Sequence, residues 1–396
     1  MTATPGQPLP QILACRASDT IQDIWQQAYS HLCLFERQAS SSLATAQQKD
    51  RNQVQSDLVS IRYLGYLLRE LPRPEGVNRI SKAINARAQS FEGILEVAQF
   101  FSDNLFKIFK GGRTPDPSSH SLHSEPFQTT LSGASGDLGN DETTGKNALE
   151  RDNYRCLFCG AIDPNAGRAA CDSHFQRLQQ PAEYTFCVHI IPEALNNLDT
   201  NFLDRIEELE IASYLLTDAA EAVAANSHDE TKICQISPRI SILDVFDSPA
   251  IISSELGGRD IHRLENIMTL CTNDRARFDN LEIWLEPVGS TPNLYHVRVS
   301  EVAFRPAKYV GRGRTEPLFQ VKLPDSSVRG PSSHYLALHA ACCRVAHLSG
   351  MAEFVDNLLQ EFDDVAVPAG YITDASVLTA FTSGLLYKKG ITVQQF

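Results

Sequence analysis

The sequence predicts an α+β protein, and three observations lead to this fold class. Residues 18 to about 110 carry apolar side chains at three- and four-residue spacing, which is typical of amphipathic helices. Apolar and polar residues alternate between Leu281 and Val299, which favours a hairpin or a pair of strands. Beyond Pro331 the helical spacing returns. Helices on both sides of a short strand-containing region indicate an α+β arrangement.

Residues 1–110 are predicted to form a helical region of three amphipathic helices. The first helix follows a cap candidate at Ser18-Asp19-Thr20, and its apolar stripe consists of Ile21, Ile24, Trp25, Ala28, Leu32 and Phe35. The second ends at Leu71-Pro72, because proline cannot continue a helix, and the third runs from Val77 to Lys110. Such helices form either a bundle with its own core or a surface for a protein partner, and both possibilities stay open.

The rest of the chain divides by composition into three further parts. Residues 111–146 are rich in Ser, Pro, Gly, Thr and Asp, which predicts a flexible linker. Residues 147–300 are predicted to form a folded module that is interrupted by an acidic, helix-prone insertion at about 193–264. Residues 301–396 contain a basic loop, followed by C-terminal helices that we expect to pack on the module.

The charge of the chain limits the ways in which it can bind nucleic acid. The formal net charge is −13 at pH 7, whereas nucleic-acid binders usually carry a basic surface that neutralises phosphates. A nucleic-acid partner therefore requires a local basic patch. The candidate residues are Arg305, Lys308, Arg312 and Arg314, with Lys322 and Arg329 further along the chain. The alternative is that these charges form an ordinary solvated loop surface.

The hydropathy and the cysteines bear on the compartment. No apolar run approaches the roughly 18 residues of a membrane-spanning helix, so we expect no membrane association. The first ten residues lack both the basic and the apolar regions of a signal peptide, which predicts an intracellular protein, cytoplasmic or nuclear. In such a compartment the ten cysteines are expected to be reduced thiols or metal ligands.

Three short stretches carry the clearest chemical pattern. They are Arg151-Asp-Asn-Tyr-Arg-Cys156-Leu-Phe-Cys159-Gly160, then Cys187-Val-His189-Ile-Ile-Pro192, and finally Glu265-Asn266 through Thr269-Leu270 to Arg277-Phe278-Asp279. Together they resemble the fungal HNH endonuclease family, whose members carry an RDxYRC entry, an HIIP strand and a strand–helix segment with an asparagine and a histidine. The resemblance continues outside these stretches, in residues 112–120, 281–295 and 339–350.

The resemblance implies a ββα-metal core, in which two strands and a helix hold a divalent cation beside a histidine. In this chemistry a histidine removes a proton from water, and the resulting hydroxide attacks the phosphorus of a phosphodiester. A cation such as Mg2+, Mn2+ or Zn2+ neutralises charge on the phosphate and on the departing oxygen. By resemblance, His189 matches the general base and Asn266 matches the asparagine that holds the loop around it.

The sequence departs from the family at the ligands of the catalytic cation. Arg275 stands where family members carry the helix histidine, and a guanidinium has no lone pair for a metal. Val188 stands where many HNH enzymes carry a metal-binding aspartate. The carboxylates of Asp274 and Asp279 are candidate replacements, and His262 is a more distant one. Arg275 itself either clamps a phosphate in place of the cation, or it points to solvent or pairs with Asp279.

A second metal site is suggested by four residues of the module. Cys156-x2-Cys159 followed by Cys171-x2-His174 supplies four side chains of the kind that bind a structural Zn2+. Paired CxxC motifs accompany bacterial HNH modules, but the fungal family usually has only the first of these cysteines. The alternative is a group of small buried thiols next to a turn.

Three functions remain open at this point. The first is a metal-dependent HNH endonuclease whose His189 acts as the base. The second is a protein that retains the fold without catalysis and binds a partner, through the N-terminal helices for example. The third is an enzyme that acts on a small molecule in an apolar pocket beside His189. Plasmid nicking with and without His189 separates the first hypothesis from the others.

Overall fold

The computed structural model describes residues 6–10, 19–106, 109–110, 141–164, 182–193, 243, 255–289, 291, 293–300, 318–320 and 329–363. The chain divides into two compact units. The first comprises Met1–Pro115, Asn197–Ser254 and Arg344–Phe396, and the second comprises Asp116–Asn196 and Glu255–Cys343. Each unit is therefore assembled from segments that are distant in the sequence.

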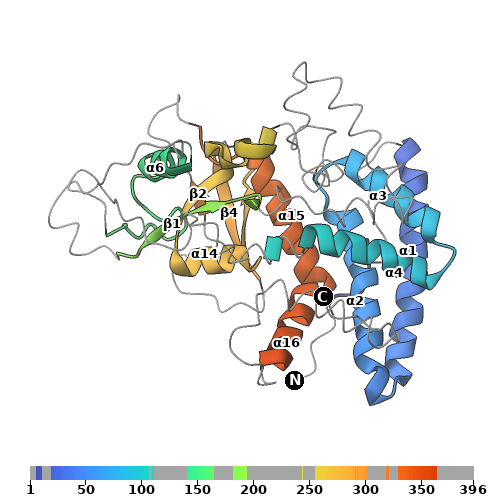
Figure 1. Ribbon diagram of the computed structural model, residues 1–396. Coiled ribbons are helices and arrows are strands. Elements are labelled where there is room, and N and C mark those ends of the chain that lie inside the picture. The colour runs from blue at the N-terminus through green and yellow to red at the C-terminus, as the bar shows by residue number, and fades with distance from the viewer. Residues whose placement is uncertain are drawn as a thin grey trace. The chain divides into compact units, whose positions relative to one another are not determined.

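The described part of the first unit is helical (Figure 1). Its elements are α1 (Asp19–Thr45), α2 (Gln48–Glu70), α3 (Pro74–Arg87), α4 (Phe91–Phe101), the π-helical turn η1 (Ser102–Phe106) and α16 (Met351–Asp363). The predicted stop at Leu71-Pro72 is confirmed, since α2 ends at Glu70 and α3 begins with Pro74. The single helix predicted from Val77 to Lys110 is wrong. Its described residues up to Phe106 form two helices and a π-turn, because Ser90 caps a new helix by accepting a hydrogen bond of 2.9 Å from the Gly93 amide.

Aromatic side chains fill the core of this helical unit. Phe100, Phe101 and Phe106 are each at most 2% exposed, and the ring of Tyr63 meets Phe106 edge to face with centroids 6.4 Å apart. These aromatic side chains therefore form core. A buried ion pair between Arg62 and Glu36, at 2.7 Å, also receives the N-terminal segment, since the Leu9 amide donates to the same carboxylate.

The second unit combines helices with two small antiparallel sheets (Figure 1). Its elements are α6 (Asp141–Arg151), β1 (Thr185–His189), η4 (Gly258–His262), η5 (Leu264–Asn266), β2 (Ile267–Cys271), α14 (Thr272–Asp279), β3 (Ile283–Pro287), β4 (Leu294–Val299), β5 (Leu318–Gln320) and the first part of α15 (Ser333–Ser349). β1 pairs with β2, and β3, β4 and β5 form the other sheet. The predicted hairpin near 281–299 is confirmed as β3 and β4. The fold class is α+β.

The pairing of β1 with β2 positions the residues that matter for function. Thr185 lies opposite Cys271 at one end, and His189 lies opposite Ile267 at the other. α14 follows β2 without a linker and contacts β1, β2 and β3. The strand pair thus leads directly into a helix that covers it.

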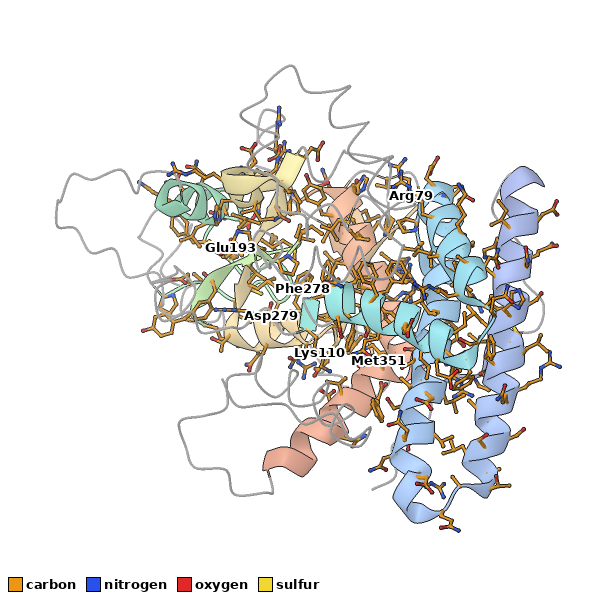
Figure 2. All side chains as sticks on the ribbon, turned by 45° about the vertical axis from the view of Figure 1, so that its right-hand side comes forward. Arg79, Lys110, Glu193, Phe278, Asp279 and Met351 are labelled. Carbon is orange, nitrogen blue, oxygen red and sulfur yellow. The ribbon has the colours of Figure 1, made fainter. Side chains whose placement is uncertain are left out.

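The start of α15 packs against the end of α14, where Figure 2 labels Phe278 and Asp279. His339 is 2% exposed, and its ring stacks on Phe278 with centroids 3.8 Å apart. Burial lowers the pKa of His339 to about 3, because desolvation penalises the charged imidazolium. Among the helices that the structure describes, none combines the length and the apolar character needed to cross a membrane.

Candidate functional site

His189 is the last residue of β1 and is partly exposed. Its strand continues into a turn, and the next amide, that of Ile190, donates a hydrogen bond of 2.8 Å to the Asn266 carbonyl. β1 also begins at a fixed point, because the carboxylate of Asp163 accepts from both the amide and the hydroxyl of Thr185, at 2.8 and 2.7 Å. The position of His189 is therefore set at both ends of a short strand.

The Asn266 side chain joins the turn after His189 to the turn before β2. Asn266 is fully buried, and its Oδ1 accepts from the Ile191 amide at 2.9 Å. Its Nδ2 donates to the carbonyls of Ile191 at 3.1 Å and Ile261 at 2.9 Å. All of these partners are backbone groups that would otherwise lack a partner in a buried region. Asn266 is thus an organiser of the loops around His189.

The Asn266 clasp, which we define as the three hydrogen bonds of the Asn266 side chain to Ile191 and Ile261, also places His262 beside His189. His262 is the last residue of η4 and directly follows Ile261, whose carbonyl Asn266 holds. The distance between His189 Nε2 and His262 Nδ1 is 3.1 Å, and the rings meet edge to face with centroids 5.1 Å apart. On the other side of the His262 ring, Glu193 Oε1 lies 3.8 Å from Nε2.

Arg151 and Asp152 hold α6 against the start of β2. Nε and one terminal nitrogen of Arg151 donate to Asp152 at 2.6 and 2.8 Å. The same terminal nitrogen also donates to the Ile267 carbonyl, and the other terminal nitrogen donates to the Leu264 carbonyl. Asp152 also accepts from the Thr269 amide at 3.1 Å. Both side chains are buried, and these additional hydrogen bonds offset the cost of removing the two charges from water. The sequence flagged this pair as a motif but did not reveal its role.

A tight turn brings two cysteines to the end of β2. The Gly160 amide donates to the Cys156 carbonyl at 2.9 Å, and Gly160 has a φ of 72°, a left-handed conformation that glycine adopts without strain. The Leu157 amide donates to the Thr269 carbonyl at 2.8 Å, which docks the turn on β2. Cys156 and Cys159 consequently face Cys271, the residue that precedes α14.

Cys156, Cys159, Cys271 and Asp274 form a group that can hold a metal ion. One ligand atom from each residue lies within 4.8 Å of all the others. Cys156 Sγ is 3.2 Å from Asp274 Oδ2, and Cys159 Sγ is 3.6 Å from Cys271 Sγ. Bonds of about 2.3 Å to a tetrahedral zinc would separate two sulfurs by about 3.8 Å, so the sulfur spacing fits such an ion closely.

The acidities of the three thiols indicate that the group favours a negative charge on one sulfur, that of Cys159. Hydrogen bonds from Cys156 and then Cys271 lower the pKa of Cys159 to about 2. The pKa of Cys271 is raised by its hydrogen bonds to Cys156 and Cys159, and that of Cys156 is raised by burial. One thiolate is thus stabilised by its neighbours, and a divalent cation would be needed to hold three.

Two of the four predicted zinc ligands belong to this cluster. Cys156 and Cys159 belong to it, whereas Cys171 and His174 lie outside the described residues. Sequence reasoning missed Cys271 as a ligand, although Cys271-x2-Asp274 repeats the spacing of Cys156-x2-Cys159. Asp274, predicted as a ligand of a catalytic cation, lies instead at the cysteines, where its side chain is fully buried.

Arg275 and Asp279 pair with each other on α14. Arg275 Nε is 3.4 Å from Asp279 Oδ2, one helical turn away, and the guanidinium lies 5.1 Å from the centre of the Phe186 ring. Of the two roles considered for Arg275, the structure therefore contains the ion pair. Val188, which precedes His189, is 4% exposed and offers no ligand atom.

A catalytic divalent cation beside His189 is not matched by the described residues. In the part of the chain that the structure describes, the cysteine cluster is the one group of three or more side chains arranged for a metal. Val188 replaces one expected ligand, and the positive guanidinium of Arg275 replaces the other while occupying Asp279. The cluster itself fits a cation, whereas the surroundings of His189 do not.

The predicted nucleic-acid-binding residues Arg305, Lys308, Arg312 and Arg314 lie outside the described residues. Most of the insertion at about 193–264 lies there as well. Comparison of the chain with models of protein families, with curated proteins and with solved structures finds no match.

Proposed function

We propose that this chain is a phosphodiester hydrolase of the HNH type, an endonuclease whose general base is His189. The observation that carries the proposal is the buried Asn266 amide, which holds the turn after His189 and the turn that ends in His262. A histidine at the end of a strand, with an asparagine that holds the loop around it, is the arrangement that the resemblance implies; here Asn266 comes from the turn before β2. Catalysis by a positioned base depends on this kind of rigidity.

The chemistry assigned to His189 is a single proton transfer. A ring nitrogen of His189 accepts a proton from water, and the hydroxide oxygen forms a bond to the phosphorus of the phosphodiester. The bond from phosphorus to the leaving oxygen breaks, and that oxygen takes up a proton from solvent. His189 is partly exposed, so water and a substrate on the surface can both approach it. The described residues around His189 do not fit a catalytic cation.

The cysteine cluster is proposed to hold a structural zinc ion. Four protein ligands fill a tetrahedral zinc and leave no position for water, so the ion would supply stability rather than chemistry. Cys156 and Cys159 come from the turn after α6, and Cys271 and Asp274 come from the junction of β2 and α14. The ion would therefore fix α14 and the turn on the strand pair that ends in His189.

A second candidate function is binding without cleavage, and the Arg275–Asp279 pair favours it. A nuclease of this type needs positive charge on the scissile phosphate in addition to a base. If no ion or side chain supplies it, the module keeps its fold and loses its rate. Such a protein would act by binding nucleic acid through residues 305–314, or a protein partner through its helical unit.

The experiment is plasmid nicking by the full chain with Mg2+, Mn2+ or Zn2+ in separate reactions. His189→Ala removes the base, and His31→Ala, a half-buried histidine on α1, is the matched control. We expect nicking by the wild-type chain and the control and a loss of at least about 100-fold in His189→Ala, the usual contribution of a general base. Folded wild-type protein that nicks with none of the cations would refute the hydrolase proposal and leave the binding function.

A further inference from the structure

A row of three side chains, His189, His262 and Glu193, lies at the end of β1. His189 Nε2 is 3.1 Å from His262 Nδ1, and His262 Nε2 is 3.8 Å from Glu193 Oε1. We propose that His262, oriented by Glu193, is a positioning residue that fixes the proton of His189 on Nε2 and thereby makes His189 Nδ1 the basic atom. The role of that base rests on the proposed hydrolase function, whereas the row of three side chains does not.

Two neutral imidazoles at this distance can pair in only one sense at a time. Each neutral ring has one N–H donor and one lone-pair acceptor, so one of the two facing nitrogens must carry the proton. Either His189 Nε2 donates to His262 Nδ1, or the reverse holds. The choice decides which nitrogen of His189 is left to accept a proton from water.

Glu193 decides between these two arrangements. A carboxylate is an acceptor only, so its position near His262 Nε2 favours a proton on that nitrogen. Neutral His262 then presents the lone pair of Nδ1 toward His189. His189 Nε2 must donate into it, and the basic lone pair of His189 is on Nδ1. The Glu193 carboxylate thus selects a tautomer of His189 that the two histidines alone would leave undetermined.

The row is built by the fold rather than by a chance meeting of surface side chains. His262 follows Ile261 directly, and Glu193 stands two residues after Ile191; the Asn266 amide holds the backbone of both isoleucines. η4 is closed at its end by the Arg263 amide, which donates to the Asp260 carbonyl at 3.1 Å. His262 has a side chain that is 17% exposed, so its ring is held mainly by protein.

Glu193 is the weaker member of the row. Its side chain is 48% exposed, so water screens its attraction to His262. A tautomer preference nevertheless requires only a modest bias, since a tenfold preference already places about nine molecules in ten in one form. We therefore expect substitution of Glu193 to weaken the preference and substitution of His262 to abolish it.

The two imidazoles have one competing role, as a pair of ligands for a divalent cation. In that case both facing nitrogens would carry lone pairs directed at the ion. Glu193 is compatible with either role, because a proton on His262 Nε2 leaves the Nδ1 lone pair directed toward His189 in both cases. The two roles predict different protonation of His189 Nε2, which is measurable.

The experiment is nitrogen NMR of the full chain labelled with 15N in histidine alone, with His189 assigned from the signals lost in His189→Ala. In the wild type we expect His189 to be protonated on Nε2, with a scalar coupling through the hydrogen bond to His262 Nδ1. His262→Gln retains an acceptor oxygen and should keep this pattern. In His262→Phe, the 15N shifts of His189 should become the averaged shifts of an imidazole that exchanges between tautomers. In Glu193→Gln, the His189 shifts should lie between those of the wild type and those averaged values.

Several results would overturn the proposal. One is a pattern for His189 that stays unchanged in His262→Phe, and another is a His189 proton on Nδ1 in the wild type. Lone pairs on both facing nitrogens would show a cation pair instead. If His262→Phe fails to fold, the wild-type spectrum and Glu193→Gln, a change at a half-exposed surface residue, still decide the question.

The same variants separate this inference from the hydrolase proposal. If nicking occurs, His262→Phe should reduce it at least tenfold and His262→Gln should restore most of it, with little change in plasmid affinity. If the spectra show the expected tautomer and no cation supports nicking, the row exists and the hydrolase proposal fails. If nicking occurs and the tautomer is unaffected by His262, the hydrolase stands and the role of His262 is refuted.

Discussion

Replacement of Asn266 by alanine removes the amide that organises the loops around His189. Three hydrogen bonds are lost, and the Ile191 amide and the carbonyls of Ile191 and Ile261 are left in a region where Asn266 itself is fully buried. An unsatisfied buried polar group costs roughly 1–3 kcal/mol. Because the freed loops can relax toward water, we expect a total of about 3–5 kcal/mol rather than the full sum.

The assay must report on the second unit alone, and the tryptophans permit this. The chain has two of them, and Trp25 lies on α1 of the helical unit whereas Trp284 lies on β3 of the second. In a Trp25→Phe background, urea unfolding followed by Trp284 fluorescence therefore measures the unit that contains Asn266. Trp284 is 8% exposed, so its emission should shift strongly when the unit unfolds.

The matched control is Asn357→Ala, which removes one side-chain hydrogen bond of 2.7 Å on α16 of the helical unit. It should leave the Trp284 transition unchanged. A loss of less than about 1 kcal/mol in Asn266→Ala would refute the reasoning, because it would mean that the three backbone groups find other partners at no cost. A large loss in the control as well would show that Trp284 does not report on its unit alone.

Three further predictions concern other parts of the molecule. Purified chain should contain about one zinc ion by elemental analysis, Cys271→Ser should lose it, and a wild-type chain without metal would refute the structural site. Because the pKa of His339 falls from 6.5 to about 3 on folding, its contribution to stability is present above about pH 6.5 and is lost as the pH falls toward 3. We expect the free energy of unfolding to be about 2 kcal/mol lower at pH 5, as followed by Trp284 fluorescence, and His339→Gln should abolish this loss. Arg275→His should release Asp279 and place two metal ligands one helical turn apart, so nicking with Mn2+ should rise at least tenfold over wild type while Arg277→His should not change it.

Local signals in the sequence were sufficient for much of the secondary structure. The proline at position 72 ended α2, and the alternation around Tyr295 predicted the β3–β4 hairpin. The break at Ser90 was missed because apolar spacing continues across it, and a cap differs from an ordinary serine only in its backbone conformation. Helix periodicity reports which face is buried and does not report where the chain changes direction.

The candidate site was predictable where its residues lie close to a recognisable motif. The resemblance predicts that Asn266 holds the loop around His189, and in the structure Asn266 bonds to the backbone of residues 190–191. The cysteine cluster was predicted only in part, because Cys271 and Asp274 stand more than one hundred residues from Cys156 and only the pairing of turn and strand brings them together. The partnership of His189 with His262 depends on two turns held by one amide, which no spacing along the chain reveals.

The two centres of the second unit place different demands on the chain. The cysteine cluster and the Asn266 clasp lie at opposite ends of β2, and each secures one end of the β1–β2 pair. The proposed zinc site and the Asn266 hydrogen bonds would together hold the strand that carries His189 in place. Among the described residues, Arg275 does not supply the positive charge that the proposed hydrolase needs on a scissile phosphate, because its guanidinium pairs with Asp279 and lies over the Phe186 ring. The Arg275–Asp279 ion pair on α14 therefore separates the proposed hydrolase from the proposed binding protein, and Arg275→His tests which of the two functions the chain has.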